Sequence, residues 1–531
     1  MSSPRRENGP VNRSKDGHDN RSVTPPGSAA TGADFLQLSL GDAPAGGRSD
    51  WLARELRLAI SDGRLPVGSK LPATRALAAD LRVSRGVVTE AYRRLTEDGQ
   101  VAGRGRAGTV VVAAPLAAPA PLPRDASLPR DALLFRDAPP PTGTALFTAP
   151  PGPDVFDALR TAPARIDLSP GLPELAAFPR AAWLRAERAV LRTVPATDLG
   201  YGDPRGAPTL RRAVANWLAR NRGIRVDPAE VLIVAGTAQA LGLIAQVLRR
   251  DGVRAIAVED PGSLGARQHL RHWQLETPPV PVDAEGIRVD ALRAAGAPAV
   301  MLTPAHQFPT GVVLGGRRRR ELLDWAGEGG LIIEDDYDAE HRYDRPPVPA
   351  LRAMLAEHVC YAGSVSKLLA PALRVGWLLA PPRYRDALVD AKRFADLGNA
   401  VLPQHVLAHL MESGELERRL RLLRTRHRRR RDAMIEAIRT HLPGAVVHGA
   451  AAGLHLTLTF ERRPDSGRAD TELADTDLAA TALAAGVKVQ PLSWHGQRPH
   501  PPGLVLGYAA SSPAAIAEGV ALLGEALRQL R

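Results

Sequence analysis

Cysteine is almost absent from this sequence, and long apolar runs are missing altogether. The single cysteine, Cys360, excludes an intrachain disulfide and is typical of a reducing compartment, so we expect a cytoplasmic protein. No uncharged apolar stretch reaches the length of about 18 residues that a membrane-spanning helix requires. The opening residues, MSSPRRENGP, are polar and lack the apolar segment of a secretory signal. We therefore expect no association with a membrane.

Lysine is also scarce, although the chain is basic overall. The formal net charge of +12 favours polyanionic partners such as nucleic acid. Hydrophobic residues (44%) and charged residues (24%) are present in ordinary amounts, which excludes disorder throughout the chain. Chemistry that needs a lysine amine has only five candidates among the 69 basic residues: Lys15, Lys70, Lys367, Lys392 and Lys488.

The 531 residues divide by composition into four segments. Residues 1–48 are polar and predict a disordered tail, whereas residues 49–112 have the pattern of a compact domain. Residues 113–164 are rich in proline and alanine, which predicts an extended linker. Residues 165–531 alternate apolar runs such as VLIVAG and LIIEDD with helical segments. This alternation predicts an α/β fold with a mostly parallel sheet and a smaller C-terminal α+β part.

Residues 49–112 have the pattern of three short helices and a basic hairpin. WLARELRLAISDG places its apolar residues on one helical face, and Gly63 ends that helix. A second helix is expected near residues 73–81, and Ser84 is expected to cap a third. Such a capped turn can deliver the third helix into the major groove of DNA. With eleven Lys and Arg against seven Asp and Glu the segment is basic, but a small helical domain with solvated arginines remains an alternative.

The segment GRLPVGSKLPATRALAADLRVSRGVVTEAYRRL resembles the winged helix-turn-helix domain of GntR-type bacterial transcription regulators. The resemblance implies double-stranded operator DNA as a partner. Arg85 suits a bidentate contact to guanine, and Gly86 permits close approach to the DNA. Val87 stands where many members carry threonine, so the family's base preference does not transfer. The expected DNA-binding residues are Arg75, Ser84, Arg85, Gly86, Val87, Arg104 and Gly105.

Lys367 stands in GSVSKLLAPALRVGW, directly after the strand-like segment HVCYAG. A lysine amine can form an imine with an aldehyde, while neighbouring serines and an arginine hold that aldehyde's phosphate. Pyridoxal 5'-phosphate is the cofactor that needs this set, together with a carboxylate for its ring nitrogen. In LIIEDDYDAEHRY, Asp335 suits the nitrogen and Tyr337 the phenolic oxygen. The expected phosphate-binding residues are Ser364, Ser366, Arg374 and, at a turn before a helix, Gly236, Thr237 and Ala238.

Each of these pieces alone has an ordinary structural explanation, such as a surface lysine or a helix cap. Together, GYGDPRGAPTL, TPAHQFPTG, EDDYDAE and GSVSKLL make residues 165–531 resemble a fold-type-I aminotransferase. HQFPTG and EDDYDAE joined to a GntR-type head are similar to the MocR/GabR subfamily of regulators. The resemblance implies a homodimer with pyridoxal phosphate on Lys367 (Schiff base), and with Tyr201 reaching the phosphate of the neighbouring subunit. Arg267 and His306 are expected to contact the effector, and no metal site is expected.

Val505 and Leu506 stand where aminotransferases often place the arginine that binds a substrate carboxylate. This departure separates cofactor binding from catalytic turnover. The favoured hypothesis is a transcription regulator whose aminotransferase-like body senses a small amine, an amino acid or pyridoxal phosphate itself. The alternative is a catalytically active aminotransferase with an accessory DNA-binding head.

Overall fold

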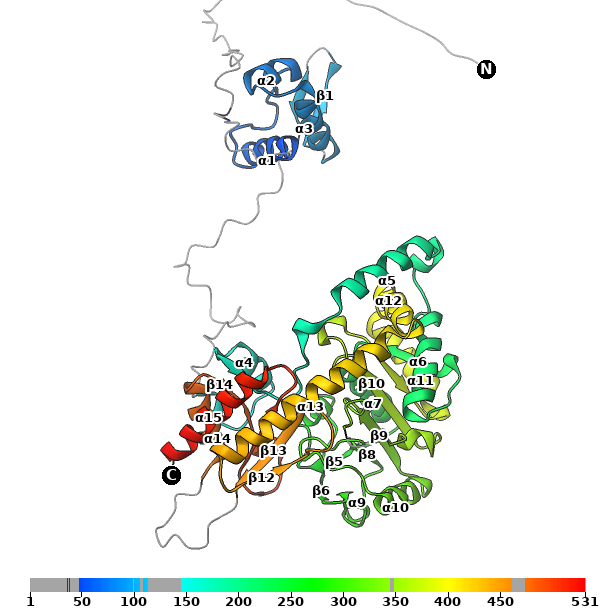
Figure 1. Ribbon diagram of the computed structural model, residues 1–531. Helices are drawn as coiled ribbons and strands as arrows, with labels where there is room; N and C mark the ends of the chain where they lie inside the picture. The colour runs from blue at the N-terminus through cyan, green and yellow to red at the C-terminus, as the bar shows by residue number, and fades with distance from the viewer. Residues whose placement is uncertain are drawn as a thin grey trace, which may run out of the picture. The chain divides into compact units, whose positions relative to one another are not determined.

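The computed structural model describes residues 36, 38, 47–98, 100–105, 108–112, 145–343, 348–460 and 473–530. The chain divides into two compact units, Met1–Arg136 and Asp137–Arg531, called here the head and the body. Almost all of the tail predicted over residues 1–48, and residues 113–144 of the predicted linker, lie outside the described residues. Figure 1 shows both units.

The head is a small helical domain with a two-stranded antiparallel sheet. Its elements are α1 (Arg48–Ser61), α2 (Thr74–Asp80), α3 (Arg85–Glu97), β1 (Val101–Gly103) and β2 (Thr109–Val111). The predicted apolar face of the first helix is buried against Leu77 of α2 and Val88 of α3. Gly63 follows α1 with a φ of +82°, a left-handed conformation that glycine adopts without strain. Three helices and a hairpin therefore form one core, as the pattern predicted.

The linker predicted over residues 113–164 is too long at its C-terminal end. Residues after 144 form η5 (Ala145–Phe147) and α4 (Val155–Thr161), and Val155 and Leu159 are buried in the core of the body. The ring of Phe147 stacks on that of Trp494, with 5.3 Å between their centroids. The local composition did not predict that this segment packs on the body, because Trp494, the partner of Phe147, lies far away in the sequence.

The body is built on a mostly parallel sheet, as predicted. Within the described residues its strand order is β4-β11-β10-β9-β8-β5-β6-β7. The strands are β4 (Leu232–Val234), β5 (Ala257–Asp260), β6 (Pro279–Asp283), β7 (Gly286–Ile287), β8 (Ala299–Leu302), β9 (Leu331–Asp336), β10 (Val359–Ser364) and β11 (Gly376–Leu379). Strands β6, β5, β8, β9 and β10 run parallel, whereas β11 and β7 are antiparallel to their neighbours. The parallel strands are buried on both faces, which explains their continuous apolar runs.

Helices pack on both faces of this sheet (Figure 1). Alternate residues of a strand serve opposite faces: Ile333 packs in the core with α7, α8 and α11, and Ile332 packs in the core with α9 and α10. The helical elements from residue 175 to residue 412 are η6 (Leu175–Ala177), α5 (Arg180–Thr193), η7 (Ala196–Leu199), α6 (Pro208–Arg222), η8 (Pro228–Glu230), α7 (Thr237–Arg250), α8 (Leu264–His272), α9 (Val289–Ala295), α10 (Gly316–Gly327), η9 (Leu351–Ala353), η10 (Pro371–Leu373), α11 (Pro382–Asp396) and α12 (Val401–Glu412).

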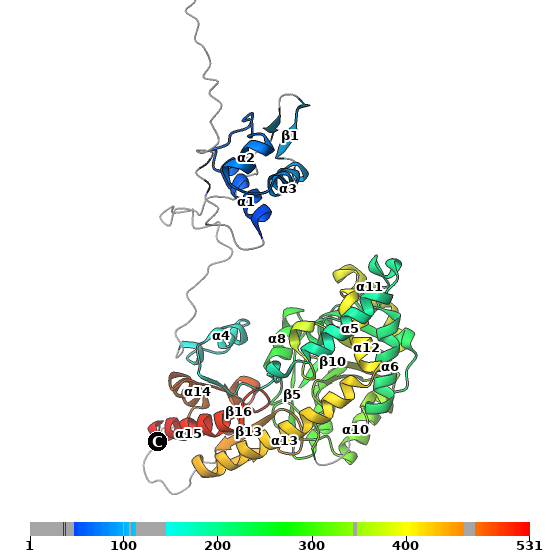
Figure 2. The same ribbon diagram turned by 45° about the horizontal axis from the view of Figure 1, so that its top comes forward.

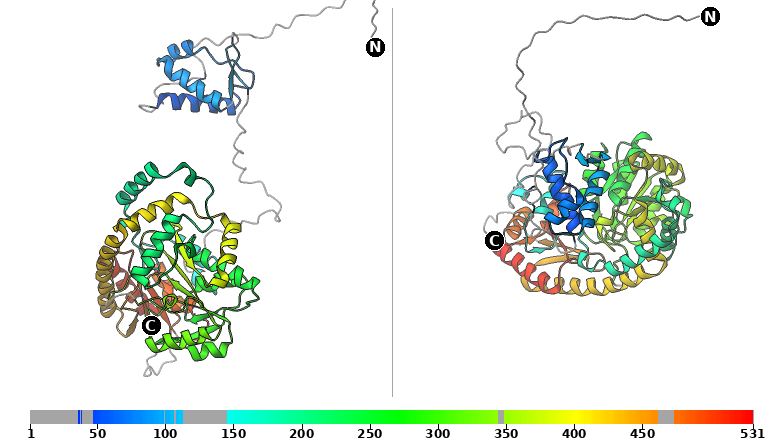
Figure 3. Two further views of the ribbon diagram at one scale, coloured as in Figure 1. Left: turned by 90° about the vertical axis from the view of Figure 1, so that its right-hand side faces the viewer. Right: turned by 90° about the horizontal axis from the view of Figure 1, so that it is seen from above.

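The C-terminal part of the body is the predicted α+β portion. An antiparallel sheet with the order β12-β13-β16-β15 carries the long helix α13 beside α15, and Figures 2 and 3 show these two helices side by side. A second, small sheet pairs β14 in parallel with β3 (Ile166–Asp167). The elements are α13 (Glu415–His441), β12 (Ala445–His448), β13 (His455–Phe460), α14 (Asp475–Ala484), β14 (Val487–Lys488), β15 (Gln490–Pro491), η11 (Leu492–His495), β16 (Gly503–Gly507) and α15 (Pro513–Leu530). Within the described ranges, no helix combines the length and the apolarity needed to cross a membrane.

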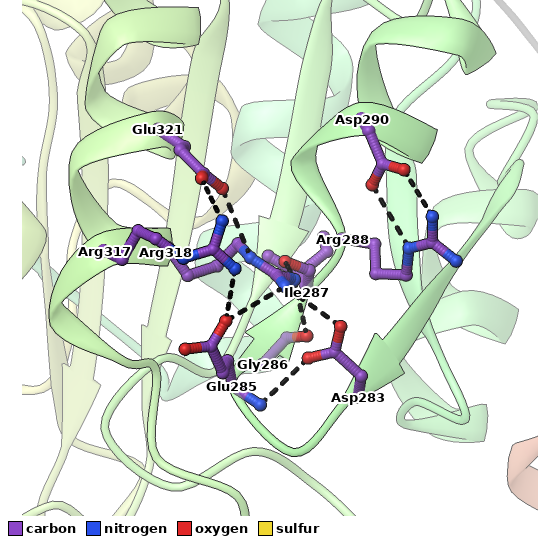
Figure 4. Close-up of polar contacts among 9 residues, drawn as sticks. All are labelled: Asp283, Glu285, Gly286, Ile287, Arg288, Asp290, Arg317, Arg318 and Glu321. Carbon is purple, nitrogen blue, oxygen red and sulfur yellow. Dashed lines mark hydrogen bonds and ion pairs between the residues drawn. The ribbon is translucent and has the colours of Figure 1, made fainter.

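A buried arginine fixes the edge of the main sheet (Figure 4). Arg318 of α10 donates hydrogen bonds to the carbonyl oxygens of Gly286 and Ile287, and one of its nitrogens lies 2.9 Å from a carboxylate oxygen of Asp283. A buried charge is tolerated when hydrogen bonds and a counter-charge surround it. The arginine therefore ties α10 to the end of β6 and to β7.

Candidate functional site

A cavity of about 600 Å³ lies in the body where strands of the main sheet end. Asp335 stands at the end of β9, Ser364 is the last residue of β10, and Thr237 begins the helix that follows β4. Ligands of such sheets bind at the carboxyl ends of strands. The cavity brings together these sequence-predicted residues: Thr237, Ala238, Asp335, Tyr337, Ser364, Ser366, Lys367 and Arg374.

Lys367 follows β10 and points its amine into the cavity wall. Its Nζ donates a hydrogen bond to the carbonyl oxygen of Gly171. Burial lowers the pKa of Lys367 below its usual range, while the Asp338 and Asp335 carboxylates oppose that shift. A lysine in this environment is more often neutral than a surface lysine, and the neutral amine is the nucleophilic form.

Asp335 presents a carboxylate to the same cavity. Burial raises the pKa of Asp335 to about 7, and the charges of Asp336 and Asp338 contribute to the rise. Lys367 and a hydrogen bond from Thr237 act in the opposite direction. That bond joins Thr237 Oγ1 to Asp335 Oδ1 over 3.5 Å, which is long for a hydroxyl donor. A cationic N–H in the cavity would therefore be a better partner for this carboxylate than its present neighbours.

The start of α7 and the loop after β10 form a cradle of donors. Gly236, at the N-cap position of α7, has a φ of +80°, and a Cβ there would lie 3.3 Å from an Arg374 nitrogen. Arg374 donates to the carbonyl oxygen of Ala235, which holds the guanidinium beside the helix start. The N-cap glycine offers no side chain to the first backbone N–H groups of α7, so these remain available to an anion.

Tyr337 is held from behind by a buried histidine. The Tyr337 hydroxyl donates to the carbonyl oxygen of His306 over 3.1 Å, and it lies 3.0 Å from His306 Nδ1. The same Nδ1 is 3.0 Å from an oxygen of Asp338. Burial raises the pKa of Tyr337 well above its usual value. The sequence prediction missed Asp338, although its place one residue after Tyr337 was a signal.

The two residues predicted to contact the effector are buried, and neither lines the cavity. His306 is 1% exposed and stands behind Tyr337 instead of lining the cavity. Arg267 is 4% exposed, and its guanidinium donates to the carbonyl oxygens of Gly262, Trp494 and His495. Burial lowers the pKa of Arg267 to about 10. Both side chains hold neighbouring segments together by hydrogen bonds, and their contact with an effector stays a prediction.

His306 also belongs to a cluster that the sequence prediction did not foresee. Ligand-type atoms of His306, Asp338 and His455 all lie within 4.8 Å of one another in the interior. Hydrogen bonds already join these residues to their surroundings, since His306 contacts Asp338 and His455 Nε2 lies 3.1 Å from the Pro309 carbonyl oxygen. The cluster is explained as a hydrogen-bonded support for the cavity wall.

Tyr201 does not line the cavity. Its side chain is 97% exposed and lies just after η7. Whether it reaches a neighbouring subunit stays a prediction.

The C-terminal part of the body forms the opposite wall of the cavity. This wall contains Lys488, Gln490 and Asp167, and α4 adds Arg160. Lys488 is 5% exposed, and its Nζ donates to the carbonyl oxygen of Arg160 over 3.2 Å. The sequence prediction counted Lys488 among five lysines without giving it a role. Its position between Val487 and Val489 in a strand-like segment was the signal that could have indicated a buried lysine.

The head carries its predicted DNA-binding residues on the surface, apart from Val87. Val87 is half-buried against the head core, so it contributes packing at the start of α3. Ser84 is the N-cap residue of α3, but its side chain makes no capping hydrogen bond. Arg85 Nε donates to Thr74 Oγ1 over 3.3 Å, which links the second and third helices. The exposed members are Arg75, Ser84, Arg85, Gly86, Arg104 and Gly105.

Known families match both units. The description "Bacterial regulatory proteins, gntR family" matches residues 49–111, and "Aminotransferase class I and II" matches residues 166–517. The chain is 31% identical over 486 residues to the probable rhizopine catabolism regulatory protein MocR of Rhizobium meliloti, covering 90% of this chain and 93% of that protein. The chain belongs to the MocR-type regulators of the GntR family.

Two further relatives support the fold and the function of this MocR-type regulator. It is 33% identical to the HTH-type transcriptional regulator TauR of Rhodobacter capsulatus, over 88% of this chain and 94% of that protein. The body is similar to LysN, an α-aminoadipate aminotransferase from Thermus thermophilus, with a TM-score of 0.63 and 29% identity over 73% of this chain and 97% of that chain. The predicted fold-type-I transferase fold is confirmed. Regulators match nearly the full length, which favours regulation over an aminotransferase with an accessory head.

Proposed function

We propose that this MocR-type regulator binds pyridoxal 5'-phosphate in the body cavity. A small amine effector competes there with the amine of Lys367, and this competition changes how the head binds operator DNA. The buried Lys367 amine beside the Asp335 carboxylate in one cavity is the observation that carries the proposal. The LysN structure, similar in fold, is complexed with N-(5'-phosphopyridoxyl)-L-leucine. We place the action of the regulator in the bacterial cytoplasm, on nucleoid DNA.

The residues around the cavity fit this cofactor. The Lys367 amine suits its aldehyde, the Asp335 carboxylate suits its ring nitrogen, and the Tyr337 hydroxyl suits its phenolic oxygen. Asp335 has only a long hydrogen bond from Thr237 in the described contacts, so a cationic ring nitrogen would complete its environment. When bound, the cofactor supplies an aldehyde that condenses reversibly with amines and a ring that accepts electron density. The phosphate would be held by Gly236, Thr237, Ala238, Ser364, Ser366 and Arg374.

The protein residues prepare the cavity for amine exchange. Burial lowers the pKa of Lys367, so a larger share of its amine is in the neutral, nucleophilic form than for a surface lysine. The Gly171 carbonyl oxygen holds the Lys367 amine in place. Hydrogen bonds with the His306 carbonyl oxygen and imidazole fix the position of the Tyr337 hydroxyl at the cavity wall. An effector amine therefore meets a preorganised site.

Regulation requires that the effector distinguish two arrangements of the protein. A ligand shifts a conformational equilibrium only when its affinity differs between the two states. The amine of Lys367 and an effector amine compete for one position, so occupancy of the cavity changes the contacts of the loop after β10. We propose that this change is transmitted to the head.

A combined titration tests the proposed function. Purified full-length protein is supplied with pyridoxal phosphate, and its visible absorbance is followed while small amines are added. In parallel, the same amines are added to a complex with a DNA fragment that the wild-type protein selects from a random pool. We expect one group of amines to change both signals at matching concentrations. A protein that binds DNA but neither colours with the cofactor nor responds to amines would contradict the proposal.

We also propose that the protein is a homodimer, with Tyr201 directed toward the cofactor phosphate of the partner. Several large apolar side chains of the body are more than half exposed, although such residues are usually buried. Leu184 and Leu191 lie seven positions apart on α5, so they share one helix face. A second copy of the chain is the proposed cover for this set: Leu184, Leu191, Leu199, Tyr201, Phe394 and Leu397.

A further inference from the structure

Lys488 is a buried cation of the cavity that the proposed cofactor does not use. It belongs to β14 in the C-terminal part of the body, whereas the proposed phosphate-binding residues lie at or beside the ends of the main-sheet strands β4, β10 and β11. Its side chain is 6% exposed. Arg160 also lines the cavity, but its guanidinium pairs with Asp157 and is mostly exposed. Within the described part of the chain, the lysines and arginines that line the cavity are Arg160, Lys367, Arg374 and Lys488.

The ammonium of Lys488 has more donors than its neighbours accept. A lysine carries three N–H donors, and the described contacts of Lys488 give it one hydrogen bond, to the carbonyl oxygen of Arg160. The nearest carboxylate oxygen, in Asp167, is 3.6 Å away, which is beyond a good hydrogen bond. The other oxygen of Asp167 accepts from the Ser169 backbone N–H over 2.9 Å. A buried charge with unused donors favours an anionic oxygen beside it.

The strands next to Lys488 supply a polar neighbour but no second cation. Gln490, two residues beyond Lys488, also lines the cavity. Gln490 is paired directly with Val505 of β16, so their side chains share one face of the sheet. Val505 is fully buried and apolar. Lys488 is therefore the cation that this wall offers, and the Gln490 amide is a further donor near it.

One short segment links Lys488 to Lys367. Asp167 lies beside the Lys488 amine, and the carbonyl oxygen of Gly171 accepts a hydrogen bond from Lys367. The Cα atoms of Asp167 and Gly171 are separated by at most about 14 Å, the reach of four extended residues. Both lysines also line the same cavity, so a ligand bound there has access to both.

We infer that Lys488, with Gln490 beside it, binds an acidic group of the effector while the effector's amine occupies the position of Lys367. The effector class is then an amine that also carries an anionic group, such as an amino acid, and not a simple alkylamine or a polyamine. This inference rests on the proposed function, since it concerns the same cavity. It adds the charge that the effector must carry and the residue that recognises it.

Matched ligands and matched variants test the inference. β-Alanine and 4-aminobutanoate are compared with propylamine and butylamine, which lack the acid group. Each is titrated into the full-length protein loaded with pyridoxal phosphate, and binding is measured by absorbance and by calorimetry. In the wild type the amino acids should bind about tenfold or more tightly than the alkylamines, the size expected for a charged hydrogen bond. Lys488→Met should remove that difference by weakening the amino acids alone.

Two further variants control for folding and for charge. Lys488→Arg keeps the cation and should retain most of the preference, whereas Lys70→Met, on the exposed surface of the head, should change nothing in the body. If Lys488→Met does not fold, Gln490→Leu provides a smaller loss in the same direction. An equal loss for amino acids and alkylamines, or an unchanged preference in Lys488→Met, would overturn the inference.

The two proposals fail in different ways. A wild-type protein that stays colourless with excess cofactor contradicts the proposed function. Calorimetry does not depend on that colour, so the comparison of wild type with Lys488→Met still decides whether Lys488 binds the acid group.

Discussion

His306 Nδ1 lies 3.0 Å from the hydroxyl oxygen of Tyr337 and also 3.0 Å from a carboxylate oxygen of Asp338. One buried imidazole therefore joins a residue of the cavity wall to an acid behind that wall. Two glycines lie against the imidazole ring of His306. A Cβ at Gly453 would overlap the ring, and a Cβ at Gly311 would lie 3.1 Å from its Nε2. The packing therefore holds the imidazole in this orientation and leaves it little space to move.

The first prediction concerns this imidazole. His306→Leu leaves the buried Asp338 carboxylate without the ring nitrogen, and an unsatisfied buried group of this kind costs about 1–3 kcal/mol. We expect the free energy of unfolding of the body to fall by that amount in urea titrations. His409→Leu, an exposed histidine on α12, serves as the control and should change the unfolding free energy little. Equal stability of His306→Leu and the wild type would mean that water or another donor replaces the ring.

The second prediction concerns Lys367. Lys367→Ala removes the amine that we propose to bind the cofactor aldehyde, so purified protein should lose the visible absorbance of the bound cofactor. The variant should remain folded, because the described contacts of Lys367 comprise one hydrogen bond, to Gly171. Absorbance spectra and circular dichroism check the two statements. Lys392→Ala is an unsuitable control, since Lys392 bonds Gln239, Asp396 and Asn399 in the interior, and Lys70→Ala is used instead.

The sequence predicted the strand-end residues of the cavity because their spacing is local. Asp335 and Tyr337 stand at or just after the end of one apolar strand, and Ser364, Ser366 and Lys367 stand at or just after the end of the next, so parallel pairing alone brings them to one edge. The head was predictable for a similar reason, since its helices show apolar periodicity within short segments.

Features that depend on distant pairing were not predictable. Lys488 reaches the cavity because β14 pairs with β3, more than three hundred residues earlier in the chain. α4 was hidden in a proline-rich segment because its burial depends on packing with the C-terminal part. Arg267 was expected at the ligand, but backbone carbonyls of a remote loop occupy its guanidinium. In each case the deciding partner lies far away in sequence.

The third prediction concerns assembly. Leu184→Asp combined with Leu191→Asp places two charges on the exposed apolar face of α5, where we propose that a second copy packs. The double variant should sediment as a monomer at concentrations where the wild type is a dimer. Leu58→Asp changes an exposed leucine of the head and should leave the dimer intact. A wild-type protein that is monomeric at every concentration would contradict the proposed dimer.

The fourth prediction concerns acid stability. Burial lowers the pKa of His427 from its usual 6.5 to about 4, with nearby arginines adding to the effect. Below pH 6.5 the unfolded chain takes up a proton at this histidine before the folded chain does, so stability is lost as the pH falls toward 4. The loss from this group alone amounts to about 3 kcal/mol across that interval. His427→Asn should therefore show a shallower fall in unfolding free energy between neutral pH and the lower end of that interval.

Urea titrations at several pH values measure this slope. His358→Asn, at a half-buried histidine that does not lie on α13, provides the comparison. If wild type and His427→Asn lose stability in parallel on acidification, then His427 is not held neutral in the folded protein.

The fifth prediction concerns DNA recognition by the head. Arg85 is exposed at the start of α3 and is positioned by its hydrogen bond to Thr74, so its guanidinium is available to a base edge in the major groove. Arg85→Ala should weaken binding to the selected DNA fragment by about 1–3 kcal/mol while binding to unrelated DNA changes less. Arg54→Ala removes an exposed arginine of α1 and tests for a general effect of charge. Gel-shift titrations at fixed salt compare both variants with the wild type on both fragments. An equal loss of affinity for the two fragments would make Arg85 a phosphate contact. No loss of affinity would exclude Arg85 from the interface. The remaining exposed residues of the turn and hairpin would then carry recognition.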